Sequence, residues 1–312
     1  MNKSLNYKLY YNEKYTGAKH AFDTTRKSKS IAEALGEDNV VDHTAYISTY
    51  DWLELANHWI ARSISPRYYR ALQTGDSPLS SSNGFSWDKG IWEMALNSTA
   101  GVMAAVESAL AYKVAGSLSS GLHHADTEGG MGFCTVNGLA VAANWILNGV
   151  FQVDNGFDSK LNVNHVTILD FDAHNGGGTV HSLRALEIDD RVDQYDLSTN
   201  TFDSYREDDN HTIAIANNDD EYLNTVAVIL ETMNQDTDIV LYNAGTDPYP
   251  EISHEALAER DKLVFDYCVQ NDIPCAFVLA GGYTWGQEMD SLVQSHVNTI
   301  YAAEDALVVE RV

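Results

Sequence analysis

Residues 166–174 read VTILDFDAH, an apolar run that ends in alternating acidic and histidine side chains. The leading VTIL is β-branched or apolar throughout, which is typical of a strand buried on both faces. Asp170, Asp172 and His174 follow at every second position, so an extended backbone would direct all of them to one side. The stretch therefore predicts a buried strand whose polar end is suited to binding a metal ion.

Two later stretches repeat this design. Residues 239–242 (IVLY) precede NAGTD, and residues 275–279 (CAFVL) precede AGGY. Helical periodicity is found in the intervening residues 221–234 and 255–270. Strands that alternate with helices predict an α/β fold, in which a parallel sheet is covered by helices on both faces. Ligands bind at the carboxyl ends of the strands in such sheets, so the three polar strand ends should converge on one site.

Length and composition are those of a globular chain. It has 312 residues, of which 44% are hydrophobic and 10% aromatic. Residues 76–89 are rich in Ser, Asp and Gly and predict a long loop. Because no repeat, low-complexity tract or convincing linker is evident, we expect residues 1–312 to form a single domain.

The formal net charge of −26 is the most unusual feature of the composition. It disfavours nucleic-acid and anionic-membrane partners. It is consistent with attraction of cationic substrates, but also with a general adaptation of the surface to solubility or salt. No apolar run approaches the roughly 20 residues of a membrane span. The beginning of the sequence resembles no signal peptide, and the three cysteines suggest no disulfide scaffold, so we expect a cytoplasmic location.

Asp172, His174 and Asp247 are the candidate metal ligands. A lone Asp-x-Asp-x-His is only moderately specific, since acidic strand ends often cap a following helix. Asp247 raises its significance, because it occupies the corresponding end of another strand, two residues after Gly245. Two carboxylates and one imidazole form an open three-ligand site with room for water and a substrate carbonyl.

Two further elements carry candidate catalytic groups. His123 and His124 lie in a glycine-rich loop that continues through Gly132 and Phe133, and Tyr283 follows a glycine pair at a strand end. Adjacent histidines are usually surface residues, and the chain has 17 tyrosines, so neither element is specific alone. Glycines allow close approach of a ligand, and a phenol can donate to a developing oxyanion.

Together these elements resemble the histone deacetylase and acetylpolyamine amidohydrolase superfamily. The stretches that carry the resemblance, in matching order and spacing, are SGLHHADTEGGMGFC (120–134), ILDFDAHNGGG (168–178), YNAGTD (242–247) and LAGGY (279–283). Within the superfamily the chain resembles the class IV histone deacetylases most, through HAFD (20–23), DAHNGGG (172–178), DDEYL (219–223), YNAGTD and RDKLVF (260–265). The resemblance implies the arginase–deacetylase fold, with a mostly parallel sheet of about eight strands between helices.

The resemblance also implies roles. Zinc, or alternatively iron(II), would be held by Asp172, His174 and Asp247, and would polarise the amide carbonyl of an acyl-lysine, acylpolyamine or related small amine. His124 matches the general base and acid, His123 the flanking histidine that Asp170 orients, and Tyr283 the oxyanion donor. The remaining implied sites are a substrate tunnel at Gly132, Phe133 and Phe202, and a K⁺ or Na⁺ site at Asp170, Asp172, His174 and Leu197. Phe202 is equally consistent with ordinary core packing.

One departure from the family pattern concerns His124. Gly177 occupies the position at which relatives usually carry the Asp or Asn that orients this histidine. We therefore expect His124 to lack a carboxylate partner, with water or a backbone carbonyl in its place or with modest turnover. If so, Gly177→Asp or Gly177→Asn should fold and should raise turnover or move the acid limb of the pH–rate profile upward.

Two other functions remain open at this point. A catalytically weak zinc protein that binds an acylated ligand or partner is supported only by Gly177. An arginase-like ureohydrolase would need further carboxylates for a second metal ion, whereas Asn175 follows His174 and Pro248 follows Asp247.

Overall fold

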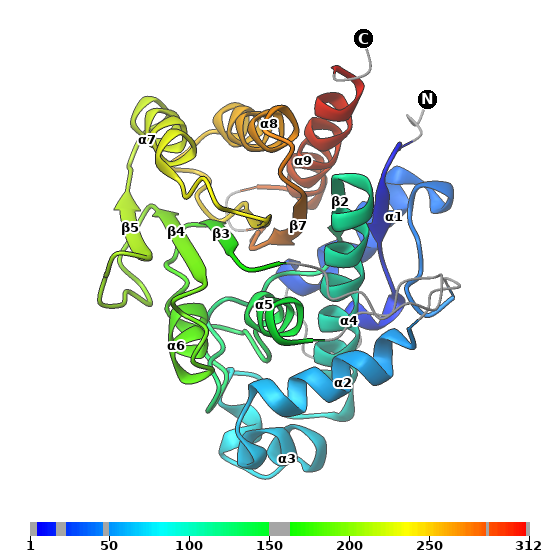
Figure 1. The fold of residues 1–312 in the computed structure, drawn as a ribbon. Helices are drawn as coiled ribbons and strands as arrows, with labels where there is room; N and C mark the ends of the chain where they lie inside the picture. The colour runs from blue at the N-terminus through cyan, green and yellow to red at the C-terminus, as the bar shows by residue number, and fades with distance from the viewer. Residues whose placement is uncertain (1–4, 17–22, 46–49, 150–162, 285–286, 310–312) are drawn as a thin grey trace.

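The structure is a computed structural model that describes residues 5–16, 23–45, 50–149, 163–284 and 287–309 (Figure 1). Its strands are β1 (Lys8–Tyr10), β2 (Val114–Ser117), β3 (Val166–Phe171), β4 (Val192–Ser198), β5 (His211–Ile215), β6 (Ile239–Gly245) and β7 (Cys275–Ala280). Its α-helices are α1 (Asp23–Leu35), α2 (Trp52–Ser63), α3 (Pro66–Thr74), α4 (Lys89–Tyr112), α5 (Gly138–Asn148), α6 (Gly177–Ala185), α7 (Asp219–Thr232), α8 (His254–Gln270) and α9 (Met289–Val309). Of the HAFD stretch, residues 20–22 lie outside the described part.

The strands form one parallel sheet in the order β1-β2-β7-β6-β3-β4-β5. Each neighbouring pair is parallel, which confirms the predicted sheet type. The described residues contribute seven strands to it, against the eight or so that the resemblance implied. The strands predicted at 166–169, 239–242 and 275–279 are β3, β6 and β7, and each continues for one to three residues beyond the apolar run.

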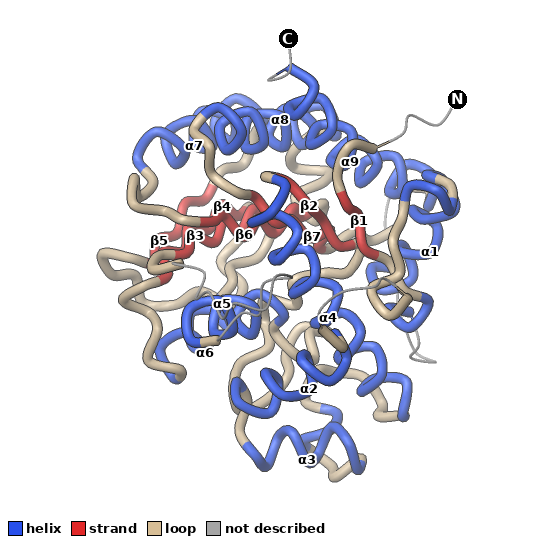
Figure 2. Tube along the Cα trace, turned by 45° about the vertical axis from the view of Figure 1, so that its right-hand side comes forward, coloured by secondary structure: helices blue, strands red, loops and turns tan. Residues whose placement is uncertain are grey.

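Helices cover both faces of this sheet (Figure 2). One core contains the sheet residues that pack against α1, α7, α8 and α9, and a second core contains those that pack against α2, α4 and α5. Every residue of β3, β6 and β7 is buried, which explains their continuous apolar sequences. The predicted α/β arrangement with helices on both faces is therefore confirmed.

The predicted loop at 76–89 contains one turn of 3-10 helix, Leu79–Ser81, and ends where α4 begins. The three cysteines are buried free thiols. Among the helices that the structure describes, none has the length and apolar character needed to cross a membrane.

Strand register brings the polar strand ends to one edge. Phe171 of β3 pairs with Ala244 of β6, and Gly245 of β6 pairs with Ala280 of β7. The residues that follow these strands, Asp172 and Asp247 among them, consequently leave the sheet side by side.

Arg260 of α8 fastens two of these strand ends together. Its Nη1 donates to the carbonyl oxygen of Phe171 at 3.0 Å and to that of Gly245 at 2.7 Å. The side chain is fully buried, and its Nε donates to Asp261 at 2.8 Å, so the charge is paired. A guanidinium with several donors is suited to this task, because one group serves two strands at once.

We expect Arg260→Met to lower the free energy of unfolding by roughly 3–5 kcal/mol, because it leaves the buried Asp261 carboxylate without its cation. Chemical denaturation would measure the loss. The matched control is Lys262→Met, which removes an exposed ion pair with Asp266 on the same helix and should leave stability nearly unchanged. Equal stability of the two variants would contradict the role given to Arg260.

Candidate active site

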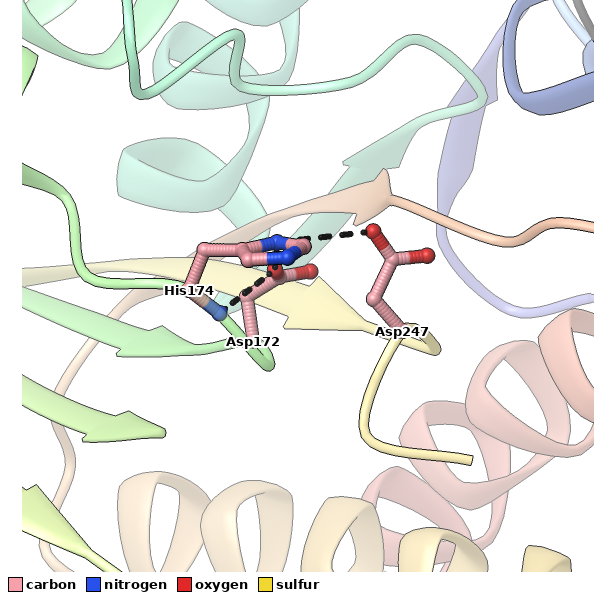
Figure 3. Close-up of side chains that lie close together, drawn as sticks. All are labelled: Asp172, His174 and Asp247. Carbon is pink, nitrogen blue, oxygen red and sulfur yellow. Dashed lines mark hydrogen bonds and ion pairs between the residues drawn. The ribbon is translucent and has the colours of Figure 1, made fainter. Parts of the chain in front are cut away.

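Asp172, His174 and Asp247 come together at the carboxyl edge of the sheet (Figure 3). Their ligand atoms all lie within 4.8 Å of one another. His174 Nδ1 is 3.2 Å from Asp172 Oδ1 and 3.7 Å from Asp247 Oδ2. The aspartate side chains are 2% and 8% exposed, whereas that of His174 is 27% exposed, so the cluster opens on the histidine side.

The donor set fits a divalent cation. Burial and the neighbouring Asp172 raise the pKa of Asp247 to about 6, which expresses the cost of placing two buried carboxylates together. Small residues make room for the cluster, since a Cβ on Gly245 would lie 2.2 Å from Asp172 Oδ2 and one on Gly281 would lie 2.6 Å from Asp247 Oδ1. Two carboxylates and an imidazole around a glycine-lined space are ligands that zinc or iron(II) accepts.

His123 is held by Asp170, as the resemblance implied. Its Nδ1 is 2.8 Å from Asp170 Oδ2, and Asn243 Nδ2 donates to the other oxygen of the same carboxylate at 2.7 Å. Burial by itself would lower the pKa of His123, but the charge and the hydrogen bond of Asp170 outweigh it and raise this pKa to about 10. The pairing with Asp170 therefore favours the charged form of His123.

The backbone of the histidine loop is fixed by Asn137, the N-cap of α5. Its Oδ1 accepts from Ala140 N, while its Nδ2 donates to the carbonyl oxygens of His123 and Ala125. The same Nδ2 donates to Thr179 of α6 at 2.8 Å. One amide thus joins the backbone of the histidine loop to two helices.

The expectation that His124 lacks a carboxylate partner is wrong. Its Nδ1 lies 2.8 Å from Oδ2 of Asp203, which follows β4 and is 79 residues away in the sequence. Burial and the adjacent His123 lower the pKa of His124, while Asp203 acts in the opposite direction. No local sequence signal indicated Asp203, because the pattern of the family places this partner at position 177.

Gly177 cannot take the usual orienting residue, because Asp203 fills the space. A Cβ on Gly177 would lie 2.3 Å from the main-chain oxygen of Asp203 and 2.5 Å from its Oδ1. The expected gain of turnover from Gly177→Asp is therefore replaced by an expected loss.

We expect Gly177→Asp to destabilise the protein by roughly 1–3 kcal/mol, as overpacking does, and to lower turnover by displacing Asp203 from His124. Gly129→Ala is a suitable control, since its Cβ would meet its nearest neighbour, Ser82 Oγ, at 3.4 Å. Thermal unfolding and turnover measured on both variants would test this. Higher turnover in Gly177→Asp would show that the Asp203 contact is dispensable.

A pocket of about 230 Å³ lies over these groups. Its lining includes both tandem histidines, Asp172, His174 and Asp247, together with Gly132, Phe133, Phe202 and Tyr283. The structure thus brings the candidate metal ligands, the candidate acid–base histidines and the candidate oxyanion donor to one cavity. Burial and the two metal-site aspartates raise the pKa of Tyr283, so its phenol remains protonated.

The two phenylalanines lie in different surroundings. Phe133 packs on Phe85 with ring centroids 5.3 Å apart, in a loop where a Cβ on Gly132 would lie 2.6 Å from the His124 ring. Phe202 is 46% exposed and its ring lies 5.0 Å from that of His124. Such exposure in the pocket is not the environment of a core side chain.

The residues of the implied monovalent cation site lie at the ends of β3 and β4. Asp170 pairs in register with Asp196, which immediately precedes Leu197. Asp196 is buried, and burial together with Asp170 raises its pKa to about 8. The carboxylate of Asp170 already accepts from His123 and Asn243, so a K⁺ or Na⁺ ion at this place stays a prediction.

Lys27 is a further basic residue at the site, and no sequence pattern indicated it. It lies fully buried in α1, and its Nζ donates to the carbonyl oxygen of Gly281, beside the metal-ligand cluster. Burial lowers the pKa of Lys27 to about 7, although Asp247 and Asp172 act in the opposite direction. A lysine in a helix is ordinarily a surface residue, so its sequence context gave no signal.

Comparison with solved structures identifies the fold. The structure is similar to that of the acetylpolyamine aminohydrolase from Burkholderia pseudomallei, with a TM-score of 0.70 over 96% of this chain and 99% of that one. At 16% identity, this similarity shows the arginase–deacetylase fold.

The family follows from the sequence. The histone deacetylase domain matches residues 20–300, so the chain belongs to the histone deacetylase family and is an amidohydrolase of the deacetylase type. An uncharacterised protein from Picosynechococcus sp. is 27% identical over 71% of this chain and 73% of its own length. Histone deacetylase 2 from Arabidopsis thaliana is 29% identical over 53% of this chain, and the match spans 43% of that plant protein. The assignment to class IV stays a prediction.

Proposed function

We propose that the chain hydrolyses an N-acyl amide, such as an acyl-lysine, an acylpolyamine or a related small amine, with zinc held by Asp172, His174 and Asp247. The observation that supports this most is that one pocket is lined by both tandem histidines, the three candidate metal ligands and Tyr283. The environment of His123 favours its cation, whereas that of His124 favours its neutral form. Paired groups with pKa values pushed apart are typical of acid–base assignments.

The protein groups then have separate roles. Neutral His124 accepts a proton from water as the water oxygen attacks the carbonyl carbon, and returns it to the nitrogen as the C–N bond breaks. Charged His123, oriented by Asp170, and the phenol of Tyr283 stabilise the negative charge that develops on the carbonyl oxygen. The products are a carboxylic acid and a free amine. A bound divalent ion would supply Lewis acidity, polarising the carbonyl and making water more acidic.

The substrate must place its amide in a pocket that Phe133 and Phe202 line. Apolar rings accept an acyl chain or the methylene groups of an amine-bearing side chain. The charge of −26 favours amines that carry further positive charge and disfavours nucleic acids. The resemblance to class IV enzymes leaves room for long acyl chains, so the length of the acyl group is a variable of the test.

The alternative of a zinc-dependent binding protein has lost its support. It depended on Gly177 leaving His124 unpartnered, and Asp203 occupies that place. The arginase-like alternative needs a second metal beside His174. The neighbouring Asn175 is fully buried and hydrogen-bonded to Ser198 and Ser204, which is a structural role.

The test is hydrolysis of acyl-lysine peptides and N-acylpolyamines of increasing acyl length, with metal analysis of the same preparation. We expect release of the free amine, one divalent ion per chain, and loss of both in a chelated sample. Two ions per chain with urea-forming activity on guanidino substrates would favour the arginase-like reading. Stoichiometric binding of the acylated compounds without cleavage would favour the binding protein.

A further inference from the structure

We infer that Asp203 is the positioning residue of His124, supplied by the segment after β4 in place of the residue that would ordinarily stand at position 177. This inference rests on the proposed function of His124. Asp203 Oδ2 lies 2.8 Å from His124 Nδ1 and also accepts from Gly178 N at 3.1 Å. With Nδ1 donating to a fixed carboxylate, the lone pair of Nε2 remains available toward the pocket.

The segment that carries Asp203 is itself held in place by Asn175. The backbone N of Asn175 donates to the carbonyl oxygen of Phe202 at 3.0 Å, and its Nδ2 donates to Ser204 Oγ at 2.9 Å. Asp203 therefore lies between two residues that are fastened to the loop after β3. Its side chain is 6% exposed, so solvent does not compete strongly for the carboxylate.

The backbone at Asp203 has a φ of +57°, in the left-handed region. Aspartate is among the few residues other than glycine that adopt this conformation at modest cost. This conformation and the absence of a Cβ at Gly177 together allow the carboxylate to reach the imidazole. A side chain at position 177 would overlap Asp203 where the structure places it, so the protein can have only one of the two beside His124.

Phe202 has a different role although it is the neighbour of Asp203. Its ring contacts His124 edge to face at 5.0 Å and His174 at 5.5 Å, and it lines the pocket. Its loss should change substrate binding, whereas loss of Asp203 should change the orientation of the base. Loss of Phe202 should therefore change mainly KM, and loss of Asp203 should change mainly kcat.

A purely structural role for Asp203 is the competing explanation, because the carboxylate also accepts from Gly178 in the first turn of α6. Three variants distinguish the two. Asp203→Ala removes both contacts, and Asp203→Asn retains an acceptor oxygen without the charge. Ser204→Ala loosens the same segment, since Ser204 Oγ bonds Asn175 and Thr201, but does not touch His124.

With an acylated substrate that the wild type cleaves, we expect Asp203→Ala to lower kcat by roughly 10–100-fold, by analogy with removing the hydrogen-bond partner of a metal-bound histidine. KM and metal content should be retained. Asp203→Asn should recover part of kcat, and Ser204→Ala should resemble the wild type. Unchanged kcat in Asp203→Ala, or an equal loss in Ser204→Ala, would overturn the inference.

Nuclear magnetic resonance of the histidine rings provides a readout that does not require turnover. A hydrogen-bonded Nδ1 proton of His124, assigned by its absence in His124→Ala, should be observed in wild type and in Ser204→Ala. It should be lost in Asp203→Ala. Persistence of that signal in Asp203→Ala would overturn the inference even if the protein hydrolyses no compound tested. An inactive wild type with the expected spectra would instead overturn the proposed function and leave the positioning contact established.

Discussion

Asp172→Ala is expected to abolish metal binding and amide hydrolysis together. Asp172 is buried with its Oδ1 3.2 Å from His174 Nδ1, at the centre of the three-ligand cluster. Its removal leaves one carboxylate and one imidazole, which is too few ligands for a protein zinc site. Metal content by elemental analysis and turnover on the best substrate of the panel would measure both losses.

Asp193→Ala provides the matched control. Asp193 is also a buried aspartate and lies 2.8 Å from a histidine, His165. It is the second residue of β4, however, and so lies near the amino end of that strand, away from the carboxyl ends that form the site. Its loss should reduce stability without removing the metal. If Asp172→Ala retained both metal and activity, Asp172, His174 and Asp247 would not form the metal site.

Tyr283→Phe is expected to lower kcat by roughly 10²–10³ while metal content and fold are unchanged, as for the loss of one oxyanion donor. The change removes a single hydroxyl from the pocket that also contains His123, His124 and the candidate metal ligands. Because the hydroxyl acts on charge that develops during the reaction, KM should change little. Steady-state kinetics on one substrate at several pH values would measure this.

Tyr249→Phe is the corresponding control, since Tyr249 follows Asp247 by two residues and its ring stacks on His254 at 4.1 Å. This variant also loses one phenol hydroxyl near the site, but Tyr249 does not line the pocket that contains Tyr283. Its kcat should stay close to that of the wild type. Full activity in Tyr283→Phe would exclude its phenol from the transition state.

Much of the framework could be predicted from the sequence. The apolar runs at 166–169, 239–242 and 275–279 are β3, β6 and β7, because strands buried on both faces need continuous apolar sequence. Their polar ends meet, since parallel strands present their carboxyl ends at one edge. For this reason the sequence alone was enough to group Asp172, His174 and Asp247.

The partner of His124 could not be predicted in the same way. Position 177 follows β3 closely in the sequence, so its glycine predicted that no side chain fills the space beside His124. Asp203 fills that place from a segment whose path is set by hydrogen bonds to the buried side chain and backbone of Asn175. Such contacts depend on the packing of loops, which leaves no periodic pattern in the sequence.

The sequence by itself determined the parallel sheet, the edge at which the site lies and the identity of the candidate metal ligands. The sheet and its edge follow from local hydrophobic pattern and strand direction, and the candidate ligands from the residue types at the strand ends together with the family resemblance. The tertiary structure alone decided that Asp203 holds His124, that Lys27 lies buried beside the metal-ligand cluster, and that the surroundings of the two histidines shift their pKa values in opposite directions. The physical reason is that protonation depends on burial and on charges within a few ångströms, and residues far apart in the chain supply both.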